Sequence, residues 1–276
     1  MSDTNNSGGN RASRQRNALL VSTALSVASV LSVLLASPML TPVAAQTTDA
    51  TTAAPVDRTV LPIAEPQYPH STVLDVRNAT APPRFAVKAP GNAPNVLIIL
   101  LDDMGFGQSS AFGGPIHMPT AEQLAKNGLE YNEFHTTALC SPTRLLTARN
   151  HLMNNTGSVM ETATAFPGDT GQRPNSIAPL AEVMRLNGYS TAAFGKAHET
   201  AAWEVSPSGP TDRWPTRSGF DKFYGFIGGE TNQWAPLIYD GMTQVEPPHN
   251  QNYHFMTDMT NQAIRWLQYQ KTLTPD

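Results

Sequence analysis

The sequence predicts an α/β fold, with a mostly parallel sheet flanked by helices. Two observations predict it. Residues 96–101 form a continuous apolar run, which is typical of a strand buried on both faces of a parallel sheet. Residues 176–194 have the pattern of a helix with one apolar face, closed by Gly188 and followed by a second short apolar strand. A strand, a helix and a further strand in this order are typical of a parallel sheet.

The other elements follow from periodicity and from capping residues. Thr120 and Gln123 have the spacing of a capping box, and Pro142 stands where a helix begins. The sequence therefore predicts, in chain order, a short helix from 120 to Gly128, a strand over 129–136, a helix over 142–149, irregular aromatic-lined structure over 203–248, and a final amphipathic helix beginning at Thr257 or Asp258.

Composition limits the class of protein. The chain has 276 residues, of which 40% are hydrophobic and 14% charged, so it can bury a substantial core in one or at most two domains. The formal net charge is -4, and there is no basic run after the first residues. Nucleic-acid binding is therefore not expected.

The first 45 residues have the pattern of an export signal. Three arginines precede an uncharged apolar run over 18–36, and small residues at 43–45 offer a cleavage site. The run approaches the roughly 20 residues of a spanning helix, so an uncleaved anchor is the alternative and the only expected membrane contact. We expect an exported protein, periplasmic or secreted. Residues 46–94, rich in Thr, Ala and Pro, are expected to form a linker and arm before a folded domain over 95–276.

Cys140 is the only cysteine, so an exported chain would have no internal disulfide. It lies just before Pro142, at the expected start of a helix, and Arg144 follows one helical turn later. Two interpretations follow from these residues alone. Cys140 is either a small buried side chain without chemistry, or a thiolate nucleophile favoured by the helix end and by Arg144.

Charged residues follow both predicted buried strands. Asp102 and Asp103 come directly after residues 96–101, where they could bind a hard cation such as Ca²⁺ or Mg²⁺, or could cap a turn. Lys196 and His198 follow the second strand and could be solvated or could contact an anion. His135, on the predicted strand before Cys140, is interpreted as a packing residue rather than a catalytic one.

Several motifs together resemble the type I sulfatases, and in order and context the N-terminal part of the bacterial arylsulfatases, in the alkaline-phosphatase-like superfamily. The motifs are Asp102-Asp103, Phe112-Gly113-Gly114-Pro115, Cys140-Ser141-Pro142-Thr143-Arg144, Gly195-Lys196-x-His198 and Phe223-Tyr224-Gly225-Phe226. The resemblance implies a sulfuric ester hydrolase with Cys140 as the precursor of formylglycine. It implies Ca²⁺, with Mg²⁺ the less favoured ion, bound by Asp102, Asp103 and modified Cys140. Arg144 would steady the aldehyde hydrate, and Lys196 and His198 would hold the sulfate ester.

The implied partners are a small-molecule sulfate ester and the formylglycine-generating machinery. The sequence departs from the family in three ways. Arg144 passes directly to Leu145 without two usual residues, and Ala197 stands where the family generally has Trp. The domain is also expected to be incomplete at its C-terminus, because the family's second group of metal ligands is not found. A catalytically inactive homologue that binds anions or partners is therefore the alternative. A phosphate or phosphonate ester hydrolase is less favoured, since those relatives usually carry Thr or Ser in place of Cys140.

Overall fold

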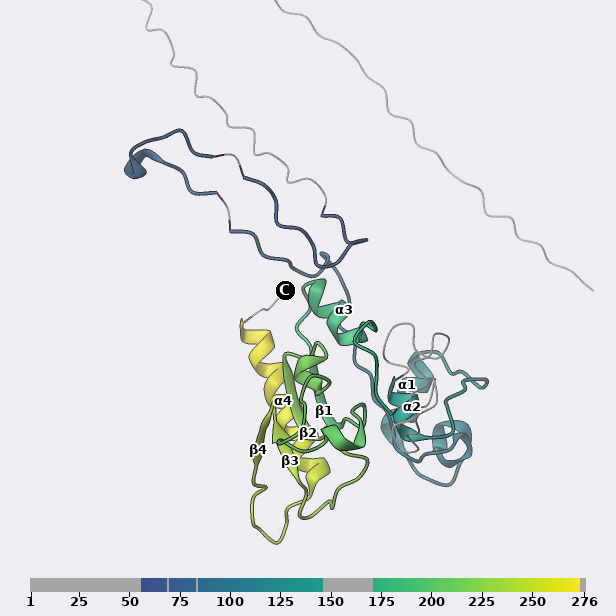
Figure 1. The fold of residues 1–276 in the computed structure, drawn as a ribbon. Helices are drawn as coiled ribbons and strands as arrows, with labels where there is room; N and C mark the ends of the chain where they lie inside the picture. Colours follow the sequence, from purple (N-terminus) through teal and green to yellow (C-terminus); the bar gives the residue numbers. More distant parts are fainter. Residues whose placement is uncertain (1–55, 69, 83, 146–170, 274–276) are drawn as a thin grey trace, which may run out of the picture. The chain divides into compact units, whose positions relative to one another are not determined.

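A computed structural model describes residues 56–273, except residues 69, 83 and 146–170 (Figure 1). The chain divides into a unit of residues 1–52 and a unit of residues 53–276, and every described residue belongs to the second. The predicted export signal therefore lies outside the described residues. The described part of the arm has no regular secondary structure apart from one short 3-10 helix, η1 (Val76–Asn78). Arg58 of the arm donates a hydrogen bond of 2.9 Å to the carbonyl of Asn187.

In the part of the chain that the structure describes, four strands form one sheet in the order β1-β2-β3-β4. They are β1 (Ala192–Lys196), β2 (Lys222–Phe226), β3 (Ile238–Asp240) and β4 (Thr243–Val245). β1 and β2 are parallel, whereas β2 with β3 and β3 with β4 are antiparallel. The α/β fold class is confirmed, and the described sheet is mixed rather than mostly parallel.

Two glycines allow β1 and β2 to approach each other. Gly195 and Gly225 are register partners, and a Cβ atom on Gly225 would overlap the carbonyl group of Gly195. Gly195 also has φ of +101°, a backbone conformation that L side chains rarely adopt. This close approach lies just before Lys196, at the carboxyl end of the parallel pair.

The helices are α1 (Pro119–Asn127), α2 (Cys140–Leu145), α3 (Leu180–Leu186) and α4 (Phe255–Leu273). Two short 3-10 helices, η2 (Phe106–Gln108) and η3 (Ser110–Phe112), precede α1, and two more, η4 (Ala202–Glu204) and η5 (Pro215–Arg217), lie between β1 and β2. α4 packs along β1 and β2 (Figure 1). Its first residue, Phe255, makes an edge-to-face contact with Phe226, with ring centroids 5.8 Å apart.

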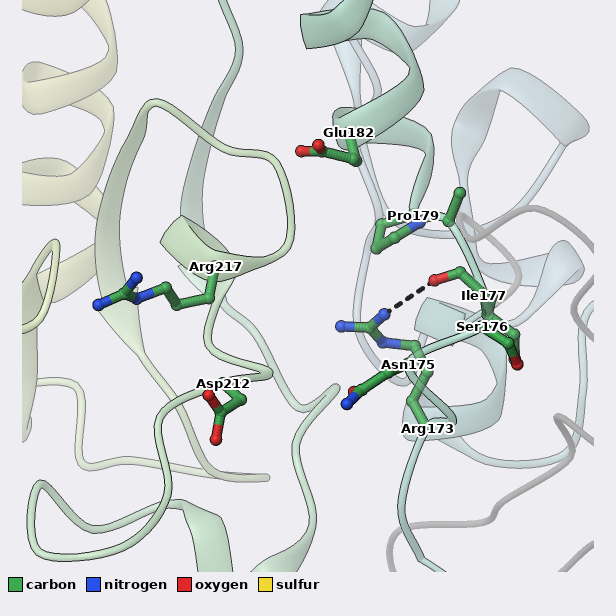
Figure 2. Close-up of a pocket in the computed structure, with 9 residues that line it drawn as sticks. Arg173, Asn175, Ser176, Ile177, Pro179, Glu182, Asp212 and Arg217 are labelled. Carbon is green, nitrogen blue, oxygen red and sulfur yellow. Dashed lines mark hydrogen bonds between the residues drawn. The ribbon is translucent and has the colours of Figure 1, made fainter. Parts of the chain in front are cut away.

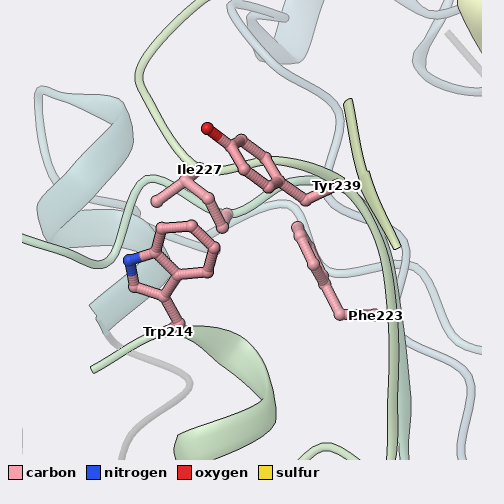
Figure 3. Close-up of a cluster of buried hydrophobic side chains, with 5 residues drawn as sticks. Trp214, Phe223, Ile227 and Tyr239 are labelled. Atoms are coloured by element: carbon pink, nitrogen blue, oxygen red, sulfur yellow. The ribbon is translucent and has the colours of Figure 1, made fainter. Parts of the chain in front are cut away.

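The core has two clusters, one on each face of β2, because side chains alternate along a strand. Figure 3 shows the first, in which Trp214 and Tyr239 meet edge to face beside Phe223 and Ile227. The second cluster lies beneath α4 and consists of Tyr224, Phe226, Ile238, Tyr253 and Phe255. The sheet and the residues that follow its strands are thus held by aromatic packing.

The predicted strand over 96–101 is wrong. These residues have no regular secondary structure, and their exposed fractions run from 42% to 81%. β1 is the terminal strand of the described sheet, and residues 96–101 do not pair with it, so their backbone groups gain no sheet hydrogen bonds. An apolar sequence favours a buried strand only where a sheet edge receives it.

Residues 129–136 also form no strand, and His135, predicted to pack, is exposed. Residues 203–248, predicted to be irregular, instead contain β2, β3 and β4. α4 begins before the predicted Thr257, and α2 begins at Cys140, before the predicted start at residue 142. The rest of that predicted helix, residues 146–149, lies outside the described residues. Among the described residues, no helix has the length and apolar character needed to cross a membrane.

A pair of lysine substitutions tests this account of residues 96–101. Leu97 is 81% exposed and Ile227 is 1% exposed. We expect Leu97→Lys to change the free energy of unfolding by less than about 0.5 kcal/mol, as for an ordinary surface position. Ile227→Lys should lower the free energy of unfolding by more than about 2 kcal/mol, because it puts a charge into the core. Urea unfolding measures both. A loss of several kcal/mol in Leu97→Lys would show that the segment is packed.

Candidate functional site

Three residues from distant segments meet through one carboxylate. Asp102 accepts a hydrogen bond of 2.9 Å from Nζ of Lys196 and a longer contact of 3.4 Å from Nη2 of Arg144. Nη1 of Arg144 donates to the backbone carbonyl of Lys196 at 2.9 Å. Asp102 comes from the turn after residues 96–101, Arg144 from α2 and Lys196 from the end of β1. We call these three residues the Asp102 cluster.

The two cations of the Asp102 cluster are more buried than its anion. The side chains of Arg144 and Lys196 are 11% and 9% exposed, whereas that of Asp102 is 43% exposed. One carboxylate against two cations leaves the cluster with a charge of +1. Buried positive charge attracts anions more strongly than the same charge in water, because the surroundings screen it less. The cluster therefore favours an additional anion.

The cluster also controls the protonation of Asp102. Burial alone would raise the pKa of this carboxyl group, but the hydrogen bond from Lys196 and the charges of Lys196 and Arg144 outweigh it and lower the pKa. Asp102 is therefore ionised at neutral pH and keeps both cations in place.

Cys140 is the first residue of α2 and is partly buried. The expectation that it lies at or just outside a helix start is confirmed. Thr143 fixes this start, since its hydroxyl group donates to the carbonyl of Leu139 at 2.8 Å and lies 2.6 Å from the hydroxyl of Thr137. Cys140 and Arg144 thus belong to one short helix, and Arg144 connects that helix to β1.

His198 lies just beyond β1 and is 8% exposed. Its backbone has φ of +49°, and its N–H group donates to the carbonyl of Ile227 at 3.0 Å. The pairing of β1 with β2 thus continues past the strands and delivers Lys196 and His198 to the same edge of the sheet.

Asp103 is exposed and also has a positive φ, +52°, which Asp tolerates better than most residues. In the described part of the chain, no three His, Cys, Asp or Glu side chains are grouped so that they could hold a metal ion. The metal site of Asp102, Asp103 and Cys140 therefore stays a prediction.

Glu199 is a candidate residue that the sequence motifs did not identify. Burial of its carboxyl group raises its pKa to about 7, although the charges of Arg173 and Arg144 lower it. The residue as a whole keeps some exposed surface, but the carboxyl group is enclosed. Its place next to His198, after a strand end, was the one available signal. Below about pH 7 this group is mostly neutral and does not cancel the positive charge of the Asp102 cluster.

The cavity in Figure 2 is separate from these residues. It has a volume of about 500 Å³ and lies between the segment that leads into α3 and the segment around η5. Arg173 lines it and donates to the carbonyl of Ile177 at 3.2 Å. No residue predicted for the site from the sequence lines this cavity.

Replacing Lys196 should change the titration of Asp102. In Lys196→Met we expect the pKa of Asp102 to rise, because a hydrogen bond and a positive charge are lost. Carbon-13 NMR of the carboxyl group measures this pKa. Because the folded-state pKa of Asp102 is lowered, its contribution to stability is present above the ordinary value of 3.8 and is lost as the pH falls through the folded-state pKa. Lys222→Met, which removes the partner of Asp240 instead, is the control and should leave the titration of Asp102 unchanged.

Glu199→Gln should flatten the pH dependence of stability. The native state holds a proton on Glu199 up to about pH 7, whereas the unfolded chain releases it near 4.5. The free energy of unfolding of the wild-type protein therefore falls as the pH rises from 4.5 to about 7. In Glu199→Gln this contribution should be absent. Denaturant unfolding at pH 4, 5.5 and 7.5 tests this. Parallel curves for the two proteins would contradict a raised pKa.

Comparison with known proteins places these residues in a family. The family model described as Sulfatase matches residues 94–275. The chain is 34% identical over 172 residues to an uncharacterized sulfatase of Schizosaccharomyces pombe, covering 59% of this chain and 29% of that protein. It is 29% identical over 156 residues to the arylsulfatase of Klebsiella aerogenes, covering 55% and 32% of the two chains. It is 35% identical over 142 residues to arylsulfatase A of Bos taurus, covering 50% and 26%.

The chain thus spans less than a third of the length of these three relatives. Among solved structures, that of Ps i-CgsB in complex with k-i-k-neocarrahexaose aligns with a TM-score of 0.46 and 17% identity, over 61% of this chain and 40% of that one. The family match covers well over half of the sequence and includes Asp102, Cys140, Arg144, Lys196 and His198. The chain belongs to the sulfatase family.

Proposed function

We propose that this chain contributes the sulfate-binding part of a sulfuric ester hydrolase of the arylsulfatase type. The observation that carries the proposal is the Asp102 cluster, in which two buried cations share one carboxylate close to the helix that begins with Cys140. A sulfate ester is a tetrahedral anion, and the excess positive charge of this cluster suits it. Family membership supports the same reaction class.

In this proposal each residue has a separate task. Lys196 and His198 hold the sulfate group, since both lie just at or beyond the carboxyl end of β1. Arg144 stands one turn from Cys140 and steadies the nucleophile that residue 140 provides. Charge that develops on the sulfate oxygens during transfer is offset by these cations, which are already oriented by Asp102 and by the Lys196 carbonyl.

Residue 140 supplies the nucleophile after modification. We propose that the formylglycine-generating machinery of the cell oxidises Cβ of Cys140 by two electrons to an aldehyde, with that machinery supplying the oxidant and the sulfur leaving as sulfide. The hydrate of that aldehyde has two hydroxyl groups: one displaces the alcohol from sulfur, and the other expels sulfate as the aldehyde forms again. A serine has one hydroxyl group and cannot take the second step. The substrate is accordingly a small-molecule sulfate ester.

We include a metal ion in the proposal only on the condition that residues outside the described ones supply further ligands. Calcium takes six to eight oxygen ligands. Asp102 and Asp103 offer two carboxylates, and both oxygens of Asp102 already contact Lys196 or Arg144. The described residues therefore do not by themselves fit Ca²⁺ or Mg²⁺, and we assign no step of the reaction to an ion. The predicted export to the periplasm or the medium stays part of this proposal.

A second candidate is an anion-binding sulfatase homologue without turnover. The pairing of Asp102 with two cations favours it, because a carboxylate occupied in this way is less available to a metal ion. This candidate keeps the same affinity for sulfate but predicts no release of sulfate from an ester.

The 276-residue chain, expressed together with a formylglycine-generating enzyme, tests the proposal. We expect mass spectrometry to find an aldehyde at residue 140 and the protein to release sulfate from p-nitrophenyl sulfate. Lys196→Met should lower turnover on the order of 100-fold, the usual cost of removing one such contact. Lys222→Met removes a lysine from a different ion pair and should keep turnover.

Two results would contradict parts of the proposal. Turnover by protein whose Cys140 is an unmodified thiol would exclude the aldehyde mechanism. Fully modified protein that binds sulfate but releases none from the ester would favour the anion-binding homologue.

A further inference from the structure

Gly229 lies against the imidazole ring of His198. A Cβ atom built on Gly229 would stand 2.9 Å from Cε1 and 3.0 Å from Nε2 of that ring. Carbon contacts this short are almost never seen, so any side chain at position 229 would force the ring or the backbone to move. His198 as a whole residue is 8% exposed, so its side chain has little free space around it.

The segment that follows β2 also holds the backbone of His198. The N–H group of His198 donates to the carbonyl of Ile227 at 3.0 Å, and the N–H group of Ala197 donates to the carbonyl of Phe226 at 2.9 Å. Ile227 itself is 1% exposed and anchored in the aromatic cluster of Figure 3. Residues 227–229 therefore fix His198 at both its backbone and its ring.

The neighbouring Gly228 makes no comparable contact. A Cβ atom at position 228 would have no atom within 4 Å, and its φ lies outside the left-handed range. Of two adjacent glycines in one loop, one is thus required by a close approach and the other is not. The requirement at position 229 comes from the His198 ring and not from the turn.

We propose that Gly229 is a positioning residue for His198. Its missing side chain leaves room for the imidazole ring of His198, two residues after Lys196, to lie against the loop that follows β2. This inference rests on the proposed function, in which His198 and Lys196 hold a sulfate group. Gly229 acts only through His198 and has no contact of its own with substrate in this proposal.

The test compares Gly229→Ala with Gly228→Ala in the full chain. The first readout is the set of imidazole NMR resonances of His198, identified among the seven histidines by their loss in His198→Ala. The second is a titration with inorganic sulfate. We expect Gly229→Ala to shift the His198 resonances and to weaken sulfate binding on the order of tenfold, because a displacement of about 1 Å is costly at such a site. Gly228→Ala should match the wild-type protein in both. Unchanged resonances and affinity in Gly229→Ala would overturn the proposal.

If Gly229→Ala is too unstable to study, a double variant shows whether the His198 ring is the reason that position 229 requires glycine. His198→Ala removes the ring that an alanine at position 229 would strike. His198→Ala/Gly229→Ala should therefore unfold at the same temperature as His198→Ala alone. A double variant as unstable as Gly229→Ala would show that the glycine serves the backbone and not the ring, and the proposal would fall.

The two readouts separate this inference from the proposed function. A wild-type protein that does not respond to sulfate would count against the proposed function. The comparison of His198 resonances between the two glycine variants would then still decide the role of Gly229.

Discussion

A single carboxylate, that of Asp102, holds together the part of the protein on which the proposed chemistry depends. Lys196 and Arg144 reach it from β1 and from α2, and both cations are largely buried. Two buried cations side by side would repel each other and pay for lost hydration without such a partner. Asp102 therefore does more than balance charge. It contacts Arg144 of α2 and Lys196 of β1, and so helps to hold α2 at the end of β1.

The sheet supplies the second half of this arrangement. Gly195 and Gly225 let β1 and β2 come close just before Lys196, and Gly195 has a positive φ that few other residues adopt. The aromatic side chains on the two faces of β2 keep the strand end in place. The end of β1 thus carries a buried lysine, and Asp102, 94 positions earlier in the chain, accepts a hydrogen bond from its amino group.

Much of the site was predictable because its residues stand in motifs. Asp102, Arg144 and Lys196 were each identified from the sequence, and they meet in the structure. The fold was less predictable where burial depends on a partner. Residues 96–101 have the composition of a central strand, but strand formation needs a neighbour, which local composition does not supply. At β2 a strand formed where irregular structure was predicted, because Gly225 between aromatic residues is not typical of a strand. Glu199 escaped notice because its unusual pKa comes from enclosure and not from a motif.

The central claim is that Asp102 and Lys196 touch in solution, and zero-length chemical coupling measures this most directly. A carbodiimide joins a carboxylate to an amine only where the two groups are in contact, and the structure places them 2.9 Å apart. The account predicts that proteolysis and mass spectrometry will find an amide bond between the peptides containing Asp102 and Lys196, and that Lys196→Arg will abolish it. Failure to find this bond, while the partly exposed pair of Lys222 and Asp240 couples readily, would contradict this contact.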